Sequence, residues 1–329
     1  MITKNIIVDP FQQHWHFADK PELGFMNIFA NAVRRISHAN PQRLPNLRDT
    51  ERLLLFSDYS GEHPEAKYIA YSFLLIRDKD LECWESARRS LRRQYLRDGR
   101  RMSYKGLGDQ QRNQALLPFL RLADKLHGLL FTVLVDRRIK SFFVHEGRLD
   151  STSVEGFENW SSMSLEKFIR IIHLASLFIA GLSREGQDVL WFTDDDDIAA
   201  NETRLHKLVD SFAKISSHYL THHLRHLRIG TSRSDTGNRS IEDLLALPDL
   251  AAGAASTAIG PMRDLPGFPC SRLVMPPRPA TPEKAKFIMG WLSESESFLK
   301  RLLFVIDEEK ESRRLRLSTL QLTSAPSGA

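Results

Sequence analysis

The sequence has little cysteine and no long uninterrupted apolar segment. Among its 329 residues there are two cysteines, Cys83 and Cys270. They give no disulfide framework and no cysteine-rich zinc site, and this usage is typical of a reducing compartment, so we expect a cytoplasmic protein. The N-terminus lacks the apolar stretch of a signal peptide, and charges or glycines interrupt the apolar runs elsewhere well short of a membrane span. We therefore expect no membrane partner.

Two common catalytic motifs are also missing. The segment Gly106-Leu107-Gly108 lacks the third glycine and the preceding strand of a nucleotide-binding loop. The Gly-x-Ser-x-Gly elbow of many serine hydrolases does not occur either. These absences argue against a nucleotide cofactor and against that class of hydrolase.

The composition indicates a folded chain with a small excess of positive charge. Hydrophobic residues make up 42% of the chain and charged residues 26%, which is enough for one large core or two smaller ones. The formal net charge of +5 favours polyanionic partners only weakly, because many soluble enzymes share such a balance.

The central part of the chain alternates between strand and helix patterns. Strands are predicted at 53–58, 68–76, 129–135, 189–193 and 224–229, and helices at 81–97, 110–125, 165–182, 201–220 and 241–255. The short turn after the first strand predicts that the first two strands form an antiparallel hairpin. A hairpin followed by strand–helix alternation predicts an α/β fold, with a mixed sheet covered by helices on both faces.

The remaining residues were assigned to the two ends of this core. Residues 1–50 are expected to form an N-terminal extension, and residues 51–260 the core itself. Residues 261–329 are expected to form a proline-rich linker, a helix that begins at Thr281-Pro282-Glu283 and a disordered tail from residue 323, with one added strand between 313 and 322. We expect Ser164 to cap the helix at 165–182, which follows it, and Pro248 to kink or break its own helix.

Three aspartates sit at informative places in these patterns. Asp58 ends the first strand, Asp194 opens a run of four aspartates after the strand at 189–193, and Asp249 lies in the last core helix. Carboxylates that meet at a sheet edge repel one another, and a divalent cation such as Mg2+ or Mn2+ relieves that repulsion. Such an arrangement can build a metal-dependent site that cleaves phosphodiester bonds.

The same acids also have structural interpretations. Asp58 and Asp249 are residue types that occur in turns and at helix caps. Four successive acids before a helix oppose its N-terminal dipole. We assign Asp194 to the site because it ends the strand, take Asp195 as the next candidate ligand, and treat the two later acids of the run as solvated. Asp136 also ends a strand, but it precedes two arginines and is expected to form a local salt bridge.

These segments together resemble one known family. Ser57-Asp58-Tyr59-Ser60-Gly61 resembles the strand-end motif Asp-Glu-Ser-Gly of a bacterial RNase H-like family, domain-of-unknown-function family 3800. Three later segments resemble further parts of this family in the same order and spacing. Its middle strand is similar to residues 133–137, and its apolar strand ending in an aspartate plus a second acid is similar to residues 189–195. Its closing helix is similar to residues 247–254. The resemblance covers about residues 52 to 256. The chain departs from the motif at Tyr59, where the family has glutamate.

The resemblance implies an RNase H-like fold and a divalent-metal-dependent nuclease acting on RNA or DNA. Its metal ligands would be Asp58, Asp194, Asp195 and Asp249, and Lys105 lies near where the family often has a lysine that neutralises phosphate charge. The family also suggests a role in a bacterial defence or mobile-element system, with a protein partner from that system. The alternative is a non-catalytic nucleic-acid-binding or assembly module, which the loss of the acid at Tyr59 favours.

Two clusters of basic residues complete the sequence analysis. The predicted helix 81–97 and the segment after it are rich in arginines, which pair with phosphates and predict a nucleic-acid surface: Arg88, Arg89, Arg92, Arg93, Arg97 and Arg101. A solvated basic helix is the open alternative. His218, His222 and His226 have the spacing of one helical face, which can bind zinc, although we favour a basic surface because no His-Glu-x-x-His motif is present.

Overall fold

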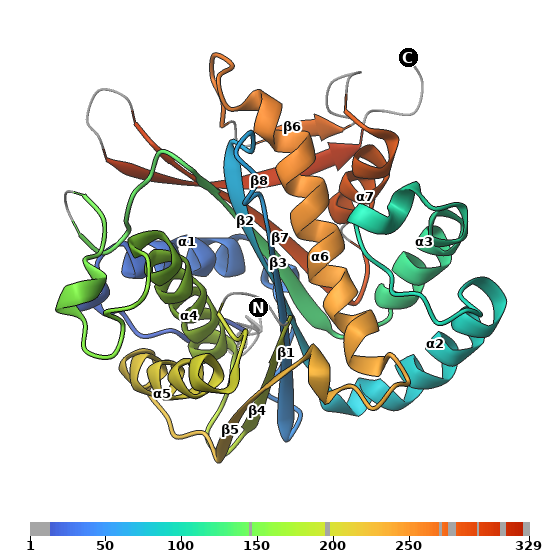
Figure 1. The fold of residues 1–329 in the computed structure, drawn as a ribbon, viewed down its shortest axis with the longest axis horizontal. Helices are drawn as coiled ribbons and strands as arrows, with labels where there is room; N and C mark the ends of the chain where they lie inside the picture. Colours follow the sequence, from blue (N-terminus) through green and yellow to red (C-terminus); the bar gives the residue numbers. More distant parts are fainter. Residues whose placement is uncertain are drawn as a thin grey trace, which may run out of the picture.

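The centre of the molecule is an eight-stranded mixed sheet (Figure 1). The structure is a computed structural model that describes residues 14–144, 147–194, 198–269, 272–275, 281–294, 296–309 and 314–324. The strands lie in the order β5-β4-β1-β2-β3-β7-β8-β6. Their bounds are β1 (Arg52–Ser60), β2 (Tyr68–Arg77), β3 (Gly128–Asp136), β4 (Asp188–Thr193), β5 (His226–Thr231), β6 (Arg272–Met275), β7 (Leu299–Glu308) and β8 (Leu315–Ser324).

Strand direction decides which ends meet. β1, β4 and β5 are parallel neighbours, and so are β3 and β7. β2 runs antiparallel to both β1 and β3, so all five of these strands end at the same edge of the sheet. The predicted antiparallel hairpin of β1 and β2 is therefore confirmed. Gly61 makes its turn, because it has φ of 91° and a Cβ there would lie 2.1 Å from the carbonyl oxygen of Tyr68.

Helices cover both faces of the sheet, as the sequence predicted (Figure 1). One face carries α1 (Phe25–Ala39), α4 (Ser162–Leu182) and α5 (Glu202–Tyr219), and the other carries α2 (Leu81–Tyr95), α3 (Gln110–Ala123), α6 (Ser240–Ile259) and α7 (Glu283–Ser293). Successive strand residues point to opposite faces. Leu53 and Leu55 of β1 thus pack with α4, whereas Leu54 and Phe56 pack with α6.

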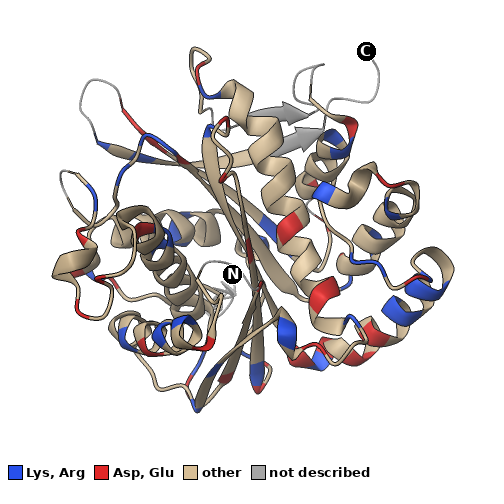
Figure 2. Cartoon of the chain, in the orientation of Figure 1, with Lys and Arg blue, Asp and Glu red and all other residues tan. Residues whose placement is uncertain are grey.

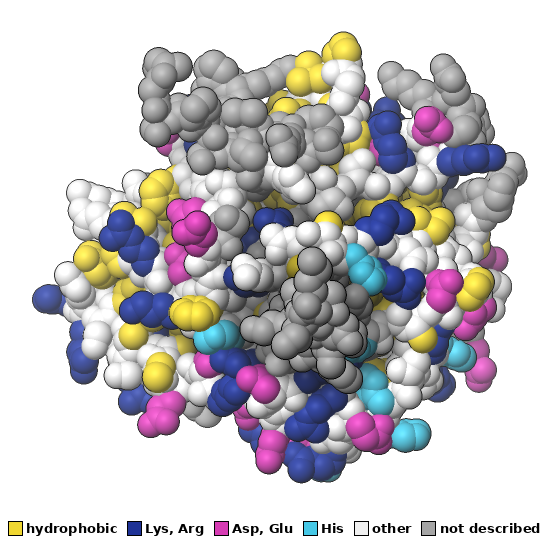
Figure 3. Space-filling view, turned by 180° about the vertical axis from the view of Figure 1, so that it is seen from behind, with side chains coloured by type: hydrophobic (Ala, Val, Ile, Leu, Met, Phe, Trp, Pro, Cys, Tyr) yellow, Lys and Arg dark blue, Asp and Glu magenta, His cyan; other side chains and the backbone are white. Residues whose placement is uncertain are grey.

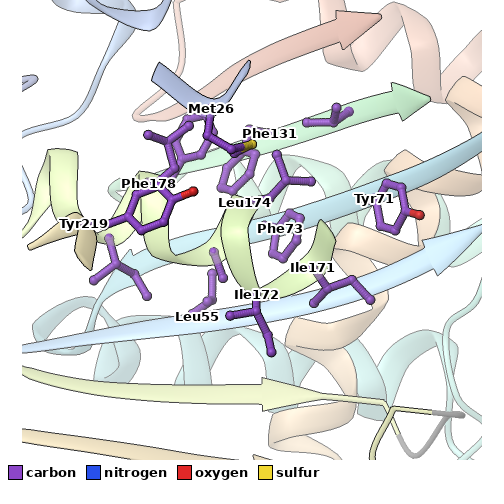
Figure 4. Packing of buried hydrophobic residues seen from close by; sticks show 14 of the residues in the cluster. Met26, Leu55, Tyr71, Phe73, Phe131, Ile171, Ile172, Leu174, Phe178 and Tyr219 are labelled. Carbon is purple, nitrogen blue, oxygen red and sulfur yellow. The ribbon is translucent and has the colours of Figure 1, made fainter. Parts of the chain in front are cut away.

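The core on the α4 face is rich in stacked aromatic rings (Figure 4). Phe131 of β3 lies between Phe73 of β2 and Phe178 of α4, with ring centroids 4.8 and 3.6 Å apart. Trp15 and Phe29 belong to the same cluster. The segment expected to be an extension thus packs into the main core: its described part, from residue 14 onward, is not peripheral.

The C-terminal part was only partly anticipated. α7 begins after Pro282 and β8 supplies an added strand, both as predicted. The expected C-terminal helical appendage was incomplete, because it did not include β7, which pairs in parallel with β3 inside the sheet. The expectation of a disordered tail was also wrong for residues 323 and 324, which belong to β8. Residues 325–329 and the proline-rich residues 276–280 lie outside the described residues.

Two local predictions are corrected as well. Ser161 rather than Ser164 caps α4, since its Oγ accepts a hydrogen bond from the Ser164 backbone N–H at 3.1 Å. Pro248 does not break its helix, because α6 is a single helix that contains it.

Candidate functional site

Two of the predicted aspartates become neighbours through strand register. β1 and β4 pair in parallel up to Ser57 and Thr193, so the next residues along the two strands are Asp58 and Asp194. Adjacent strands lie about 4.8 Å apart. By alternation both carboxylates lie on the sheet face of Phe56 and Phe192, whose rings stack 5.4 Å apart. This is the face that α6 covers.

A cleft of about 930 Å³ lies where α6 meets this edge of the sheet. Its lining includes Asp58, Asp194, Asp249 and Lys105, which are the four described residues that the sequence analysis assigned to catalysis. Asp195 lies outside the described residues. Arg101 also lines the cleft, and it alone of the six arginines proposed for nucleic-acid binding does so. Figure 2 shows acidic bands on α6, and both basic and acidic bands along α2.

The carboxylate of Asp249 is held by the loop that follows α2. The backbone N–H of Tyr104 donates a hydrogen bond to Asp249 Oδ2 at 2.7 Å. The pKa of Asp249 is raised to about 6, chiefly by burial and also by the negative charge of Asp194, while the Tyr104 N–H, Lys105 and Arg101 oppose the shift. Asp194 and Asp249 are thus close enough to interact electrostatically.

The small residues after Asp249 explain how this loop approaches α6. A Cβ at Gly253 would lie 2.4 Å from the Cγ and Cδ1 atoms of the Tyr104 ring. Tyr104 is buried there, and Lys284 Nζ lies 4.4 Å from the ring centroid on α7's side. The segment that resembled a family's closing helix therefore has a packing role here: it seats Tyr104, whose N–H holds Asp249.

Gly253→Ala tests this packing. The added methyl group must displace the ring, so we expect a loss of about 1–3 kcal/mol in the free energy of unfolding. Gly290, inside α7, is the matched control because a Cβ there would meet nothing within 4 Å. Gly290→Ala should be neutral or stabilise by up to about 1 kcal/mol. Denaturant unfolding of both variants measures the difference, and equal stabilities would contradict the account of Gly253.

Glu242 is a cleft residue that the sequence analysis missed. It lies in the first turn of α6, seven residues before Asp249, and lines the same cleft. Residues seven apart in a helix share a face, so this spacing was the signal available in the sequence. Arg101 Nε lies 2.9 Å from Glu242 Oε1, and its NH2 group lies 3.7 Å from Asp194 Oδ1.

The tyrosine at position 59 packs away from α6. Its hydroxyl lies 2.8 Å from Ser57 Oγ, and its ring packs against the cluster on the α4 face. Lys167 Nζ lies 5.2 Å from the ring centroid. By strand alternation an acid at this position would also project toward α4. Its absence thus takes no carboxylate from the α6 side of the sheet, where Asp58 and Asp249 lie.

The acidic side chains of the cleft are of a chemical type that suits a hard divalent cation. Asp58, Asp194, Asp249 and Glu242 supply carboxylate oxygens, which Mg2+ and Mn2+ prefer. The guanidinium of Arg101 already places a positive charge between Asp194 and Glu242. Within the part of the chain that the structure describes, however, no three His, Cys, Asp or Glu side chains come close enough together to hold one ion. These acids share a cleft but not one coordination sphere.

Two of the arginines proposed for nucleic-acid binding are structural. The side chain of Arg88 is 1% exposed, and its NH1 group donates to Asp243 Oδ2 at 2.9 Å. Arg92 NH1 donates to the other oxygen of Asp243 at 2.7 Å. The prediction that these two contact nucleic acid is wrong for this conformation, because their guanidinium groups are committed to a buried carboxylate. Arg89, Arg93 and Arg97 remain exposed on and just after α2.

The histidines do not share a helical face. α5 ends at Tyr219, so only His218 is helical, while His222 lies in the following loop and His226 begins β5. His222 Nε2 lies 2.8 Å from Ser183 Oγ, and His226 Nδ1 lies 2.9 Å from Asp188 Oδ1. Figure 3 shows histidine side chains at several separate places on the rear face. The zinc-compatible spacing therefore has no counterpart in the fold.

Asp136 has the role that the sequence analysis favoured. It is fully buried at the end of β3, and both of its oxygens accept hydrogen bonds from Arg138 Nε at 3.1 Å. Arg263 approaches its Oδ1 at 3.6 Å. The predicted local salt bridge is confirmed.

The raised pKa of Asp249 predicts a pH-dependent stability. The carboxyl group titrates at 3.8 ordinarily and at about 6 in the fold, so the fold binds this proton more tightly than the unfolded chain does. The resulting stabilisation is present below pH 4 and is lost as the pH rises through 6. Asp249→Asn mimics the neutral form of the carboxyl group. Without metal at pH 8, its free energy of unfolding should therefore be about 1–3 kcal/mol higher than that of wild type. At pH 4 the two should match. Thermal melts at both pH values measure this, and equal stability at pH 8 would contradict it.

Comparisons with known proteins complete the description of the site. No helix among the described residues is both long and apolar enough to cross a membrane. No protein-family model matches the chain, and no curated protein matches it in sequence.

Proposed function

We propose that this chain is a divalent-metal-dependent nuclease with an RNase H-like fold, which cleaves phosphodiester bonds of RNA or DNA. One observation carries the proposal: Asp58, Asp194 and Asp249 come from two strand ends and a helix, and all three line one cleft with Lys105. Convergence of carboxylates from separate elements is what a metal-dependent phosphodiesterase needs.

The fold is compatible with the RNase H-like part of the proposal. The mixed sheet begins with an antiparallel hairpin and continues by strand–helix alternation, with helices on both faces. The family resemblance adds a role in a bacterial defence or mobile-element system, with a protein partner from that system.

The residues of the cleft divide the chemistry between them. When bound, Mg2+ or Mn2+ would supply an activated water and positive charge for the phosphate. Asp58, Asp194 and Asp249 would hold the ion. Lys105 is exposed in the cleft, where its ammonium can neutralise phosphate charge. Asp249 Oδ2 is occupied by the Tyr104 N–H, which leaves Oδ1 for a proton or a cation.

The second candidate is a non-catalytic nucleic-acid-binding or assembly module. It is favoured by the separation of the acids, since no three of the described side chains suited to metal binding stand close enough to hold one ion. In that case Arg101 would pair permanently with Asp194 and Glu242, and the cleft would bind a ligand without cleaving it.

A cleavage assay separates the two candidates. The protein is incubated with single-stranded and double-stranded RNA and DNA, in Mg2+, in Mn2+ and in chelator. Metal-dependent products from at least one substrate, absent in chelator, would support the nuclease. Binding of nucleic acid without products in any condition would overturn it in favour of the binding module.

The exposed arginines of α2 give a separate prediction about binding. Arg89→Glu with Arg93→Glu should weaken nucleic-acid binding on the order of tenfold to a hundredfold at about 0.1 M salt, for all sequences alike. The salt dependence should flatten by roughly two counterions. The control is Arg35→Glu with Lys214→Glu, an equal charge change at exposed positions of α1 and α5 on the other sheet face. Fluorescence anisotropy against salt measures both, and equal losses would reduce the effect to net charge.

A further inference from the structure

Arg101 is the only described arginine that joins two acids of the cleft. Its Nε lies 2.9 Å from Glu242 Oε1 and its NH2 group lies 3.7 Å from Asp194 Oδ1. It also lowers the pKa of Asp249 through its charge, which offsets part of the effect of burial. A guanidinium in this place does for the metal-free cleft what a cation would do: it reduces repulsion between carboxylates.

The backbone of Arg101 is held in place, whereas its side chain is held only weakly. Its carbonyl oxygen accepts a hydrogen bond from Arg112 Nε at 2.7 Å, and three residues later the Tyr104 N–H is bound to Asp249. The loop backbone is thus anchored at two points. The side chain of Arg101 is 46% exposed, and ion pairs of that exposure are individually weak. The guanidinium can therefore leave its carboxylates without unfolding the loop.

Glu242 and Asp194 have different partners besides Arg101. Glu242 also pairs with Arg239, so it stays neutralised when Arg101 moves away. Asp194 keeps a hydrogen bond from Ser232 Oγ at 2.8 Å. Each carboxylate therefore retains at least one polar partner when Arg101 moves away.

We propose that Arg101 is a built-in competitor for the divalent cation of this cleft. In the metal-free protein its guanidinium holds Asp194 and Glu242; ion binding displaces it, and the released guanidinium then pairs with a phosphate of the substrate. This inference rests on the proposed function, because it assumes that a divalent ion binds among Asp58, Asp194 and Asp249.

The inference predicts that removing the competitor strengthens metal binding. Arg101→Gln should bind Mn2+ about two- to fivefold more tightly than wild type, which is the range expected for loss of a half-exposed ion pair. Lys105→Gln is the matched control, because it removes the same charge from the cleft and Lys105 forms no salt bridge with the described residues. Arg101→Lys keeps the charge but loses the planar fork, so its affinity should lie between those of wild type and Arg101→Gln.

Isothermal titration with Mn2+ alone measures these affinities, and circular dichroism checks that each variant is folded. Tighter binding by Arg101→Gln than by both wild type and Lys105→Gln supports the competition. Equally tighter binding by the two variants would show an effect of net charge alone and would overturn the competition. Unchanged or weaker binding by Arg101→Gln would also overturn it. If Arg101→Gln does not fold, the comparison of Arg101→Lys with wild type decides in the same way. Absence of Mn2+ binding to wild type would instead overturn the proposed metal site itself.

Discussion

Asp58→Asn should lower metal-dependent cleavage at least about a hundredfold while leaving the protein folded. Asparagine has the shape of aspartate but no charge, so it loses its electrostatic hold on a divalent ion. Asp58 lies in β1 just past the last residue paired with β4, beside Asp194, and both line the cleft. Cleavage by wild type and variant in Mn2+ measures the loss.

The same variant should be no less stable than wild type when metal is absent. Asp58 Oδ1 accepts the Tyr59 backbone N–H at 2.6 Å, and the amide oxygen of asparagine can keep that bond. Removing one charge from a group of acids that repel one another also lowers the electrostatic cost of folding. A large loss of metal-free stability, or full activity, would count against Asp58 as a metal ligand.

Asp136→Asn is the matched control for that experiment. It also changes an aspartate at the carboxyl end of a strand, but this carboxylate is fully buried and paired with Arg138 and Arg263. The Arg138 side chain is 43% exposed, so solvent compensates part of the lost partner, and the change should cost about 1–3 kcal/mol in the free energy of unfolding. A site residue and a structural residue at equivalent strand ends should therefore respond in opposite ways.

The sequence was most informative where the relevant signal is local. Continuous apolar runs located β1 to β4, and an aspartate directly after such a run is expected at the sheet edge. Asp58 and Asp194 were found in this way. Glu242 escaped because its only signal is a spacing of seven from Asp249, and that spacing matters only once the helix is known to face the acids.

The errors arose where a partner lies far away in the sequence. β7 holds the apolar run Leu302–Ile306, but it follows charged residues, and its partner β3 ends at Asp136, far earlier in the chain. The histidine spacing suggested one helical face, although the helix predicted at 201–220 and the strand predicted at 224–229 already separate the three residues. The actual stop at Tyr219 is set by the chain turning into β5, which pairs with β4.

Arg88 shows the same limitation in its electrostatics. The sequence reveals five arginines around one helix, but it does not reveal that Asp243, 155 residues after Arg88, pairs with two of them. The net charge of a helix therefore overstates how much positive charge faces solvent. The exposed part that remains, at Arg89, Arg93 and Arg97, is a narrower surface than the sequence suggested.

Asp243→Asn should be among the most destabilising single changes in the chain, at about 3 kcal/mol in the free energy of unfolding. Asp243 is 2% exposed in its side chain and accepts hydrogen bonds from both Arg88 and Arg92. Loss of its charge leaves Glu85, at 2.8 Å, as the acidic partner of the buried Arg88 guanidinium, which also donates to the carbonyl oxygen of Asn238 at 2.8 Å. These remaining partners keep the expected cost at the lower end of the range for broken buried pairs.

Asp98→Asn is the control, because it removes the same charge from an exposed pair with Arg100 in the loop after α2. That change should leave stability essentially unaltered, since solvent replaces the lost partner. Urea unfolding midpoints at neutral pH compare the two variants. If Asp243→Asn costs no more than Asp98→Asn, Arg88 is not held in a buried pair, and it returns to the set of arginines available for a phosphate. A large difference instead means that charge reversal at Arg88 would abolish nucleic-acid binding by unfolding the protein, so only the exposed arginines can report on the binding surface.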